Sequence, residues 1–208
     1  LRLTESSMGP IPEGWSVGTL GEVAKERRDG VAAELLNGSM HYIALEHMPR
    51  HSIALADWTD ADGVVSNKMR FSTGDILFGT LRPYFHKVGV APVSGICSTY
   101  IVVAQPIAPE WFGFVLSVMS SVDFVSHTDR GSAGTKMPRT NWADMAAYKV
   151  AKPPMNLAAQ FTTLVQPLVD RVITIIHENR ELSAMREALL PKLISGELPV
   201  PETLGRTD

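Results

Sequence analysis

Cysteine is nearly absent from this chain of 208 residues, since Cys97 is the single one. One thiol cannot form an internal disulfide or a cysteine metal cluster. Long apolar runs are also missing: residues 111–119 form a run about half as long as a bilayer crossing, and no segment reads as a signal peptide. We therefore expect a cytoplasmic protein with no membrane partner, in which Cys97 packs within a strand and is not a nucleophile.

The chain also lacks an overall excess of positive charge, because its formal net charge is -3. The charges are unevenly distributed, however: residues 64–154 carry nine basic and five acidic side chains, and the segments on either side are acidic. Phosphate contacts need clustered Lys and Arg rather than a basic average. The middle segment fits a polyanion-binding face, and equally a solvated surface with scattered cations.

Catalytic motifs are absent too. Imidazoles and a carboxylate occur close together at His41, Glu46, His47 and His51. They lack the HExxH spacing that places two ligands on one helical face, and metal binding by these histidines stays open as an alternative. The stretch RGSAGTK at 130–136 has two residues between its glycines where a phosphate loop has four, and no nucleophile-elbow sequence occurs. We therefore expect no enzyme and no cofactor on this chain.

Short runs rich in β-branched and aromatic residues predict a strand-rich domain, because Gly, Pro, Asp or Asn separates them at close intervals. The runs are residues 40–48, 64–71, 75–81, 87–93, 97–106 and 147–155. The segment after Trp15 predicts a short strand and the start of a helix. Residues 109–128 have apolar side chains at helical spacing and predict one helix on the sheet, followed by a polar loop at 130–145.

The segment 156–195 differs in kind, since it has no glycine and repeats an apolar residue every seventh position. This pattern predicts a helical rod about 60 Å long, with Asn156 as N-cap, Gly196 as the stop, a kink at Pro167 and an early end at Pro191 as an alternative. A heptad stripe favours pairing of helix with helix, although the helix could instead fold back over its own domain. The predicted pairing positions are Phe161, Leu164, Leu168, Val172, Ile175, Leu182, Met185 and Leu189.

Several basic, hydroxyl and aromatic residues of the middle segment have the chemistry that DNA recognition uses. Arginine forks match guanine edges, while lysines and hydroxyls match phosphates. Each of these residues alone could be an ordinary surface side chain, and together they make DNA binding the leading hypothesis. The candidate DNA-binding residues are Lys68, Arg70, Arg82, Tyr84, His86, Lys87, Arg130, Ser132, Thr135, Lys136 and Arg139.

Five segments, in order along nearly the whole chain, resemble the specificity (S) subunit of type I restriction-modification systems. They are GPIPEGWSVGTLGEV at 9–23, GDILFGTLRP at 74–83, GTKMPRTNW at 134–142, KPPMNLAAQ at 152–160 and LLPKLISGEL at 189–198. Subunits of this family carry two target recognition domains, each followed by a long helix, and the two helices pack antiparallel. The present chain resembles one such half.

The resemblance implies an α+β fold with a lead-in at 1–10, a target recognition domain at 11–153, a coiled-coil helix at 154–198 and a flexible tail at 199–208. It implies double-stranded DNA, the methyltransferase (M) subunit and the restriction (R) subunit as partners. S-adenosylmethionine, ATP and magnesium would then belong to the complex and not to this chain.

Whether the chain is a natural half-subunit that forms a homodimer or a fragment of a longer subunit stays open, as does a coiled-coil interaction module without independent DNA binding.

Overall fold

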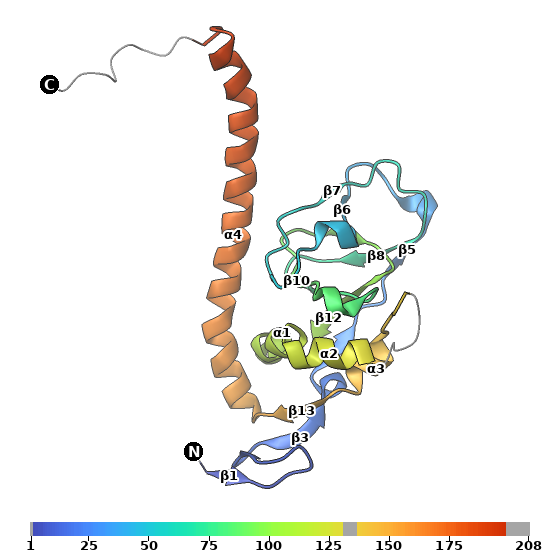
Figure 1. The fold of residues 1–208 in the computed structure, drawn as a ribbon, viewed down its shortest axis with the longest axis vertical. Coiled ribbons are helices and arrows are strands. Elements are labelled where there is room, and N and C mark those ends of the chain that lie inside the picture. The colour runs from blue at the N-terminus through green and yellow to red at the C-terminus, as the bar shows by residue number, and fades with distance from the viewer. Residues whose placement is uncertain (1, 131–136, 199–208) are drawn as a thin grey trace, which may run out of the picture.

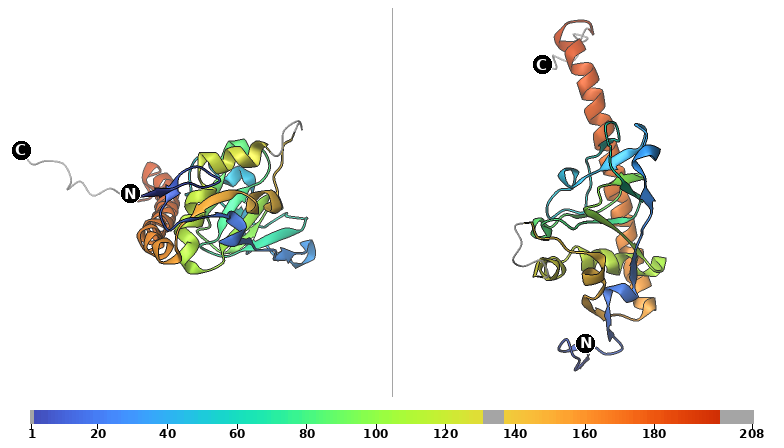
Figure 2. Two further views of the ribbon diagram at one scale, coloured as in Figure 1. Left: turned by 90° about the horizontal axis from the view of Figure 1, so that it is seen from below. Right: turned by 90° about the vertical axis from the view of Figure 1, so that its right-hand side faces the viewer.

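The computed structural model describes residues 2–130 and 137–198. A strand-rich domain is followed by one long helix that runs along its side and continues past it (Figures 1 and 2). This is the α+β arrangement that the sequence predicts. None of the helices in the described part of the chain has an apolar span of the length that a bilayer requires.

The N-terminal segment forms two small antiparallel pairs. Strand β1 (Leu3–Thr4) pairs with β2 (Ile11–Pro12), so the lead-in turns back on itself, and β3 (Ser16–Thr19) pairs with β13 (Lys149–Lys152). The helix expected after Trp15 is wrong: it is a single 3-10 turn, η1 (Leu20–Glu22), followed by strand β4 (Ala24–Glu26). Pairing with distant backbone prevails over local helix formation, since the Leu20 amide donates to the Tyr148 carbonyl at 2.9 Å.

Two sheets form the body of the domain. The first has the order β10-β9-β12-β4 and the second the order β5-β8-β11-β6-β7. Among the strand pairs of these two sheets within the described residues, β11 and β6 alone run parallel. The remaining bounds are β5 (Gly30–Val31), β6 (His41–Ile43), β7 (Thr59–Asp60), β8 (Lys68–Phe71), β9 (Ile76–Gly79), β10 (Val88–Val90), β11 (Gly95–Cys97) and β12 (Ile101–Pro106), with 3-10 turns η2 (Ala33–Leu35) and η3 (Leu45–His47).

Strand β9 is buried on both of its faces. Ile76 and Phe78 belong to the core beneath the helices, whereas Leu77 belongs to a second core together with residues of the other sheet. Successive side chains of a strand point to opposite faces, so this one strand contributes to both cores. The end of β9 is thereby held rigidly, so the loop that follows it starts from a fixed position.

The single helix expected at 109–128 is wrong, because the chain forms a 3-10 turn, η5 (Pro109–Trp111), and two helices, α1 (Phe112–Met119) and α2 (Val122–Arg130). The hydroxyls of Ser120 and Ser121 donate to carbonyls of the preceding turn, and the Ser121 hydroxyl accepts from the Phe124 amide at 3.2 Å. Serine side chains compete with the helical backbone in this way. The new direction buries Phe124, whose ring packs on Phe78.

The polar loop expected at 130–145 is wrong at its end, because a short helix, α3 (Trp142–Ala146), begins there. The Asn141 side chain accepts from the Asp144 amide at 3.1 Å and caps it. An asparagine followed by such a short helical pattern is an N-cap signal.

The long helix α4 spans Met155–Ile194. Its N-cap residue is Pro154 and not Asn156, and it passes through Pro191 before Gly196 ends it with a φ of 76°. The predicted early end at Pro191 is therefore wrong, and the glycine stop is confirmed.

Helix α4 packs on the domain from its start as far as Arg180. The Thr162 hydroxyl donates to the Glu110 carbonyl at 2.7 Å and accepts from the Gly113 amide at 3.0 Å. Ala158, Val169 and Ile176 are buried against the domain, whereas every residue from 181 to 198 is exposed. The helix therefore lies on its own domain at the start and projects freely at the end.

Candidate nucleic-acid interface

The stretch from 74 to 91 forms two paired core strands with a basic turn between them. Strands β9 and β10 are antiparallel, with Phe78 opposite Val88, and the turn η4 (Pro83–Phe85) connects them. Helix α2 packs against this turn (Figure 1). Tyr84 of this turn is thus presented at the surface from a rigid, buried base.

Both ends of η4 have strained backbone. Arg82 has a φ of 52° and His86 a φ of 51°, and neither is glycine. The third such residue within the described ranges, His51, adjoins them: its amide donates to the His86 carbonyl at 3.0 Å. Left-handed conformations cost non-glycine residues on the order of 1 kcal/mol each and cluster at functional sites.

Residues 138–140 run beside the start of this turn. The Arg82 amide donates to the Pro138 carbonyl at 2.8 Å, and Leu81 forms an antiparallel bridge with Arg139. The Thr140 amide in turn donates to the Thr80 carbonyl at 3.1 Å. Two segments more than fifty residues apart in sequence thereby bring Arg82 and Arg139 to one place.

Arg139 is exposed and held in a defined direction. Its guanidinium lies 4.9 Å from the centroid of the Tyr100 ring and donates to the Thr99 carbonyl at 3.3 Å. Stacking on an aromatic ring and one hydrogen bond leave the other guanidinium donors available for a ligand. Tyr100 was not predicted as a site residue, and no local signal in its strand-like surroundings points to this role.

Tyr84 occupies the tip of the turn, and its side chain is exposed. Its ring packs edge-on against Phe85 at 4.7 Å, and the Arg50 guanidinium lies 3.9 Å from the Phe85 centroid. Arg50 is another site residue that the sequence does not reveal, because the fold alone brings it beside the turn. The tip therefore carries an aromatic ring flanked by arginine.

Three predicted DNA-binding residues turn inward. His86 is buried and its Nε2 lies 2.8 Å from the Ser120 carbonyl oxygen, while Lys68 is buried with its amine donating to Ser66 at 3.0 Å. The Lys87 amine donates to the Leu45 carbonyl. Burial lowers the pKa of both lysines, with Arg50 adding to the effect at Lys87. These three side chains support the fold.

The remaining candidates are dispersed. Arg70 lies on β8, is exposed, and pairs with Asp29 at 3.7 Å. Arg130 is the exposed last residue of α2, the helix that packs on η4. Ser132, Thr135 and Lys136 lie outside the described residues.

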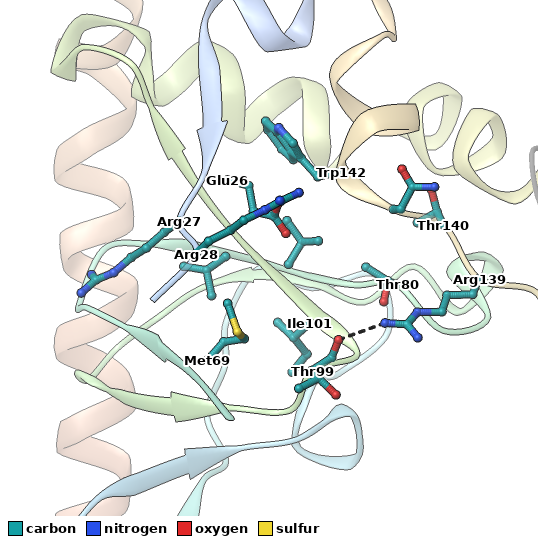
Figure 3. Close-up of a pocket in the computed structure, with 13 residues that line it drawn as sticks. Glu26, Arg27, Arg28, Met69, Thr80, Thr99, Ile101, Arg139, Thr140 and Trp142 are labelled. Atoms are coloured by element: carbon teal, nitrogen blue, oxygen red, sulfur yellow. Dashed lines mark hydrogen bonds and ion pairs between the residues drawn. The ribbon is translucent and has the colours of Figure 1, made fainter. Parts of the chain in front are cut away.

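A cavity of about 320 Å³ opens beside Arg139 (Figure 3). It separates the 139–142 segment from the end of β4, and Arg28 borders it on the β4 side. The Thr140 hydroxyl, which lines this cavity, is buried and has no hydrogen-bond partner. The lining residues are Glu26, Arg27, Arg28, Met69, Thr80, Thr99, Ile101, Val102, Val103, Arg139, Thr140, Asn141 and Trp142.

The histidines considered as metal ligands have separate surroundings. The His47 Nδ1 accepts from the Ala44 amide at 3.0 Å, the His41 Nδ1 lies 3.9 Å from Asp60, and the His51 ring packs on His86. Within residues 2–130 and 137–198, no group of three or more His, Cys, Asp or Glu could hold a metal ion.

Cys97 ends β11 and is fully buried, as the sequence predicts. Burial raises the pKa of its thiol to about 12. A thiol with such a pKa is overwhelmingly protonated near neutral pH.

Comparison with known proteins finds no matching family model. The chain is 27% identical over 203 residues to the type I restriction enzyme EcoDI specificity subunit of Escherichia coli, and 24% identical over 201 residues to the MjaIX specificity subunit of Methanocaldococcus jannaschii. These alignments cover 90% and 92% of this chain. The homologues of this chain are type I specificity subunits.

The chain spans less than half the length of those specificity subunits, 43% and 46% respectively. Solved specificity-subunit structures share its fold. The HsdS subunit of Thermoanaerobacter tengcongensis matches with a TM-score of 0.58 at 20% identity, covering 96% of this chain and 53% of that one. A second solved structure, described as the structural basis of complex assembly and conformational transition of the type I R-M system, contains a chain that matches with a TM-score of 0.60 at 21% identity. The match covers 94% of the present chain and 52% of that one.

Proposed function

We propose that this chain is a DNA-recognition half of a type I specificity subunit and reads one half of a bipartite target. The observation that carries this proposal is the convergence of Arg82, Tyr84 and Arg139 on paired loops above a rigid strand base. Loops on a rigid scaffold commonly carry recognition. The homology to specificity subunits supports the same conclusion.

The interface would consist of the turn at 82–85, the segment 137–140 and the residues that orient them. Arg82 and Arg139 supply guanidinium groups for base edges or phosphates. Tyr84 supplies an exposed ring at the tip. Arg130, the exposed last residue of α2, is a further candidate. Ser132, Thr135 and Lys136 stay candidates on the sequence alone.

The chain itself would have no catalytic role. Methyl transfer and cleavage would belong to M and R subunits. S-adenosylmethionine, ATP and magnesium would be bound by those partners and not by this chain. Recognition needs positioned donors and no activated nucleophile, which agrees with the protonated thiol of Cys97. The specificity half would set the place on DNA where its partners act.

Salt-titrated binding of the purified chain to duplex DNA tests the proposal. Counterion release makes the logarithm of the affinity fall linearly with the logarithm of salt concentration for a phosphate binder. Methylome sequencing of cells that express the chain with its cognate M subunit then identifies the target. Affinity that is absent at low salt, together with an unchanged methylome, would favour a coiled-coil interaction module that does not bind DNA.

A further inference from the structure

The cavity beside Arg139 is a concave site between two segments that are far apart in the sequence (Figure 3). One wall is formed by the end of β4. The other is formed by residues 139–142, the segment that pairs with the loop at Thr80 and Leu81. Because Arg139 belongs to this cavity and also to the candidate nucleic-acid interface, the cavity is continuous with that interface.

Arg27 and Arg28 leave the end of β4 in opposite directions (Figure 3), as successive residues of an extended chain do. Arg27 pairs with Asp29 and Asp75, so its charge is compensated within the domain. Arg28 has a side chain that is 76% exposed, and its Nε–H donates to the Glu26 carboxylate. A guanidinium carries further N–H donors on its two Nη atoms, and those of Arg28 are available to a ligand at the cavity.

Positive charge exceeds negative charge along the described lining of this cavity. Apart from Arg27, whose charge is compensated, the lining contains two cations, Arg28 and Arg139, and one carboxylate, Glu26. The surplus is one positive charge. A DNA backbone phosphate carries one negative charge, and arginine guanidinium groups bind phosphate oxygens through parallel N–H bonds. The lining therefore matches a single backbone phosphate.

The wall of the cavity also contains a hydroxyl that lacks an acceptor. Thr140 is 3% exposed, and its Oγ1 has no hydrogen-bond partner within the described part of the chain. A buried hydroxyl without a partner destabilises the folded state. Rotation by about 120° around the Cα–Cβ bond moves a threonine hydroxyl from one staggered position to the next, so a phosphate oxygen in the cavity could accept from it.

We propose that this cavity holds one backbone phosphate of the bound DNA between Arg28 and Arg139, with the Thr140 hydroxyl as a third donor. The inference rests on the proposed function, since the phosphate belongs to the DNA that the chain reads, and it adds Arg28 and Thr140 to the interface. A phosphate contact carries no sequence information, but it fixes the register of a protein on the duplex. The cavity would thereby position the turn at 82–85 over the base edges.

Salt-titrated binding of an Arg28→Ala variant tests the phosphate contact. Affinity should fall about tenfold for the target half-site and for random duplex alike, and the slope of log affinity against log salt should decrease by about one. Arg28→Lys retains the charge without the fork, so it should keep the slope and lose less affinity. Lys25→Ala removes an exposed cation of β4 that does not line the cavity, and it is the matched control. An Arg28→Ala slope equal to that of the Lys25→Ala control would overturn the proposal.

Neutral methylphosphonate linkages locate the phosphate. Duplexes of the half-site that methylome sequencing identifies would carry one such linkage at a time. At one linkage the wild type should lose about tenfold in affinity, whereas Arg28→Ala should lose nothing further there, because two changes that remove the same contact are not additive. Losses that add at every linkage would show that Arg28 contacts no individual phosphate, and would overturn the proposal.

Thr140→Val separates a ligand donor from a packing defect. Valine removes the unpaired hydroxyl, so the Tm of the free chain should rise by about 2 to 4 °C. Affinity for duplex DNA should nevertheless fall, by about threefold to tenfold, because the third donor is lost. A purely structural role predicts the higher Tm alone. A higher Tm with unchanged affinity would overturn the assignment of Thr140 to the site.

Other occupants of the cavity would give different results. Saturable binding of deoxyadenosine monophosphate to the free chain in calorimetry, lost in Arg28→Ala while duplex affinity is unchanged, would identify a free nucleotide. Weaker assembly of Arg28→Ala with the M subunit, again with unchanged duplex affinity, would identify a protein carboxylate. Either result overturns the DNA phosphate.

The phosphate site and the proposed function can fail separately. A wild-type chain that binds no duplex DNA at low salt would reject the proposed function itself. Duplex binding that Arg28→Ala leaves intact, in affinity and in salt slope, would reject only the phosphate site. Circular dichroism of each variant checks that the domain remains folded.

Discussion

The guanidinium carbon of Arg180 lies 3.7 Å from the centroid of the Trp58 ring, and an Arg180 Nη1 group donates to the Ala56 carbonyl at 3.2 Å. One turn earlier, the His177 ring packs edge-on against the same indole. Beyond Arg180, all described residues of the helix are exposed. This contact therefore marks the last point at which the domain holds α4.

Replacing Trp58 should loosen the helix from the domain. Trp58→Ala removes a buried ring that packs in the same core as Ile176, and we expect it to lower the free energy of unfolding by about 3 to 5 kcal/mol. Trp58→Phe keeps most of the packing and should cost less. Arg180→Ala removes a cation–π contact worth about 0.5 to 1 kcal/mol. Urea titration of the three variants measures these differences, and a Trp58→Ala loss below that of Arg180→Ala would contradict the packing described.

Arg82 offers a way to separate strain from DNA binding. Arg82→Gly should raise the free energy of unfolding by about 1 kcal/mol, because glycine adopts a positive φ without a steric penalty. Arg82→Ala retains the strain and should leave stability nearly unchanged. Both variants should lose about 1 to 3 kcal/mol of DNA-binding free energy if the guanidinium reads a base. Lys149→Ala, on β13, removes an equal charge elsewhere and serves as the control for net charge. Full affinity in both Arg82 variants would remove this residue from the interface.

Gly95 is required where β11 pairs with β6. A Cβ atom at this position would lie 2.3 Å from the His41 carbonyl oxygen, which is part of the backbone and cannot move aside. Gly95→Ala should therefore lower the free energy of unfolding by about 1 to 3 kcal/mol. Gly30→Ala is the matched control, since a Cβ there meets nothing within 4 Å. Equal thermal unfolding of the two variants would disagree with the close approach of β6 and β11.

Cys97 should make the protein less stable in alkali. Burial raises the thiol pKa from 9.0 to about 12 in the folded chain, so the folded state retains its proton where the unfolded state has lost it. The thiol's contribution is full below pH 9 and declines toward pH 12, by up to about 1.4 kcal/mol per pH unit. The lowered pKa values of Lys68 and Lys87 act in the opposite direction. Comparison with Cys97→Ala isolates the thiol, and parallel stability curves for the two proteins between pH 8 and 11 would contradict this contribution.

The homodimer, which the sequence leaves open as one alternative, predicts a symmetric DNA target. Two identical recognition domains related by a two-fold axis should read an inverted repeat, whose halves are separated by bases that are not read. Methylome sequencing with the cognate M subunit would reveal this symmetry. An asymmetric bipartite target would show that the second half-site is read by a different domain.

Local patterns in the sequence determined much of this protein. The seven-residue repeat and the absence of glycine from 156 to 195 specified a long helix, and Gly196 specified its end. Alternating runs with turn residues specified the strands around 74–91, since backbone periodicity and φ preferences depend on adjacent residues. The resemblance to type I specificity subunits was likewise carried by short segments in order.

Only the tertiary structure decided which side chains face outward. The sequence treats Lys68, His86 and Arg139 alike, yet two are buried and one is stacked in the open over Tyr100. The sequence does not predict that Arg50 lies beside Phe85. It also does not predict that Val169 is buried while Leu168 stays exposed. Burial depends on contacts between segments far apart in the chain, and local spacing carries no information about which distant segment arrives. The helix itself follows from the sequence, but which of its apolar residues the domain buries and which stay exposed follows from the fold.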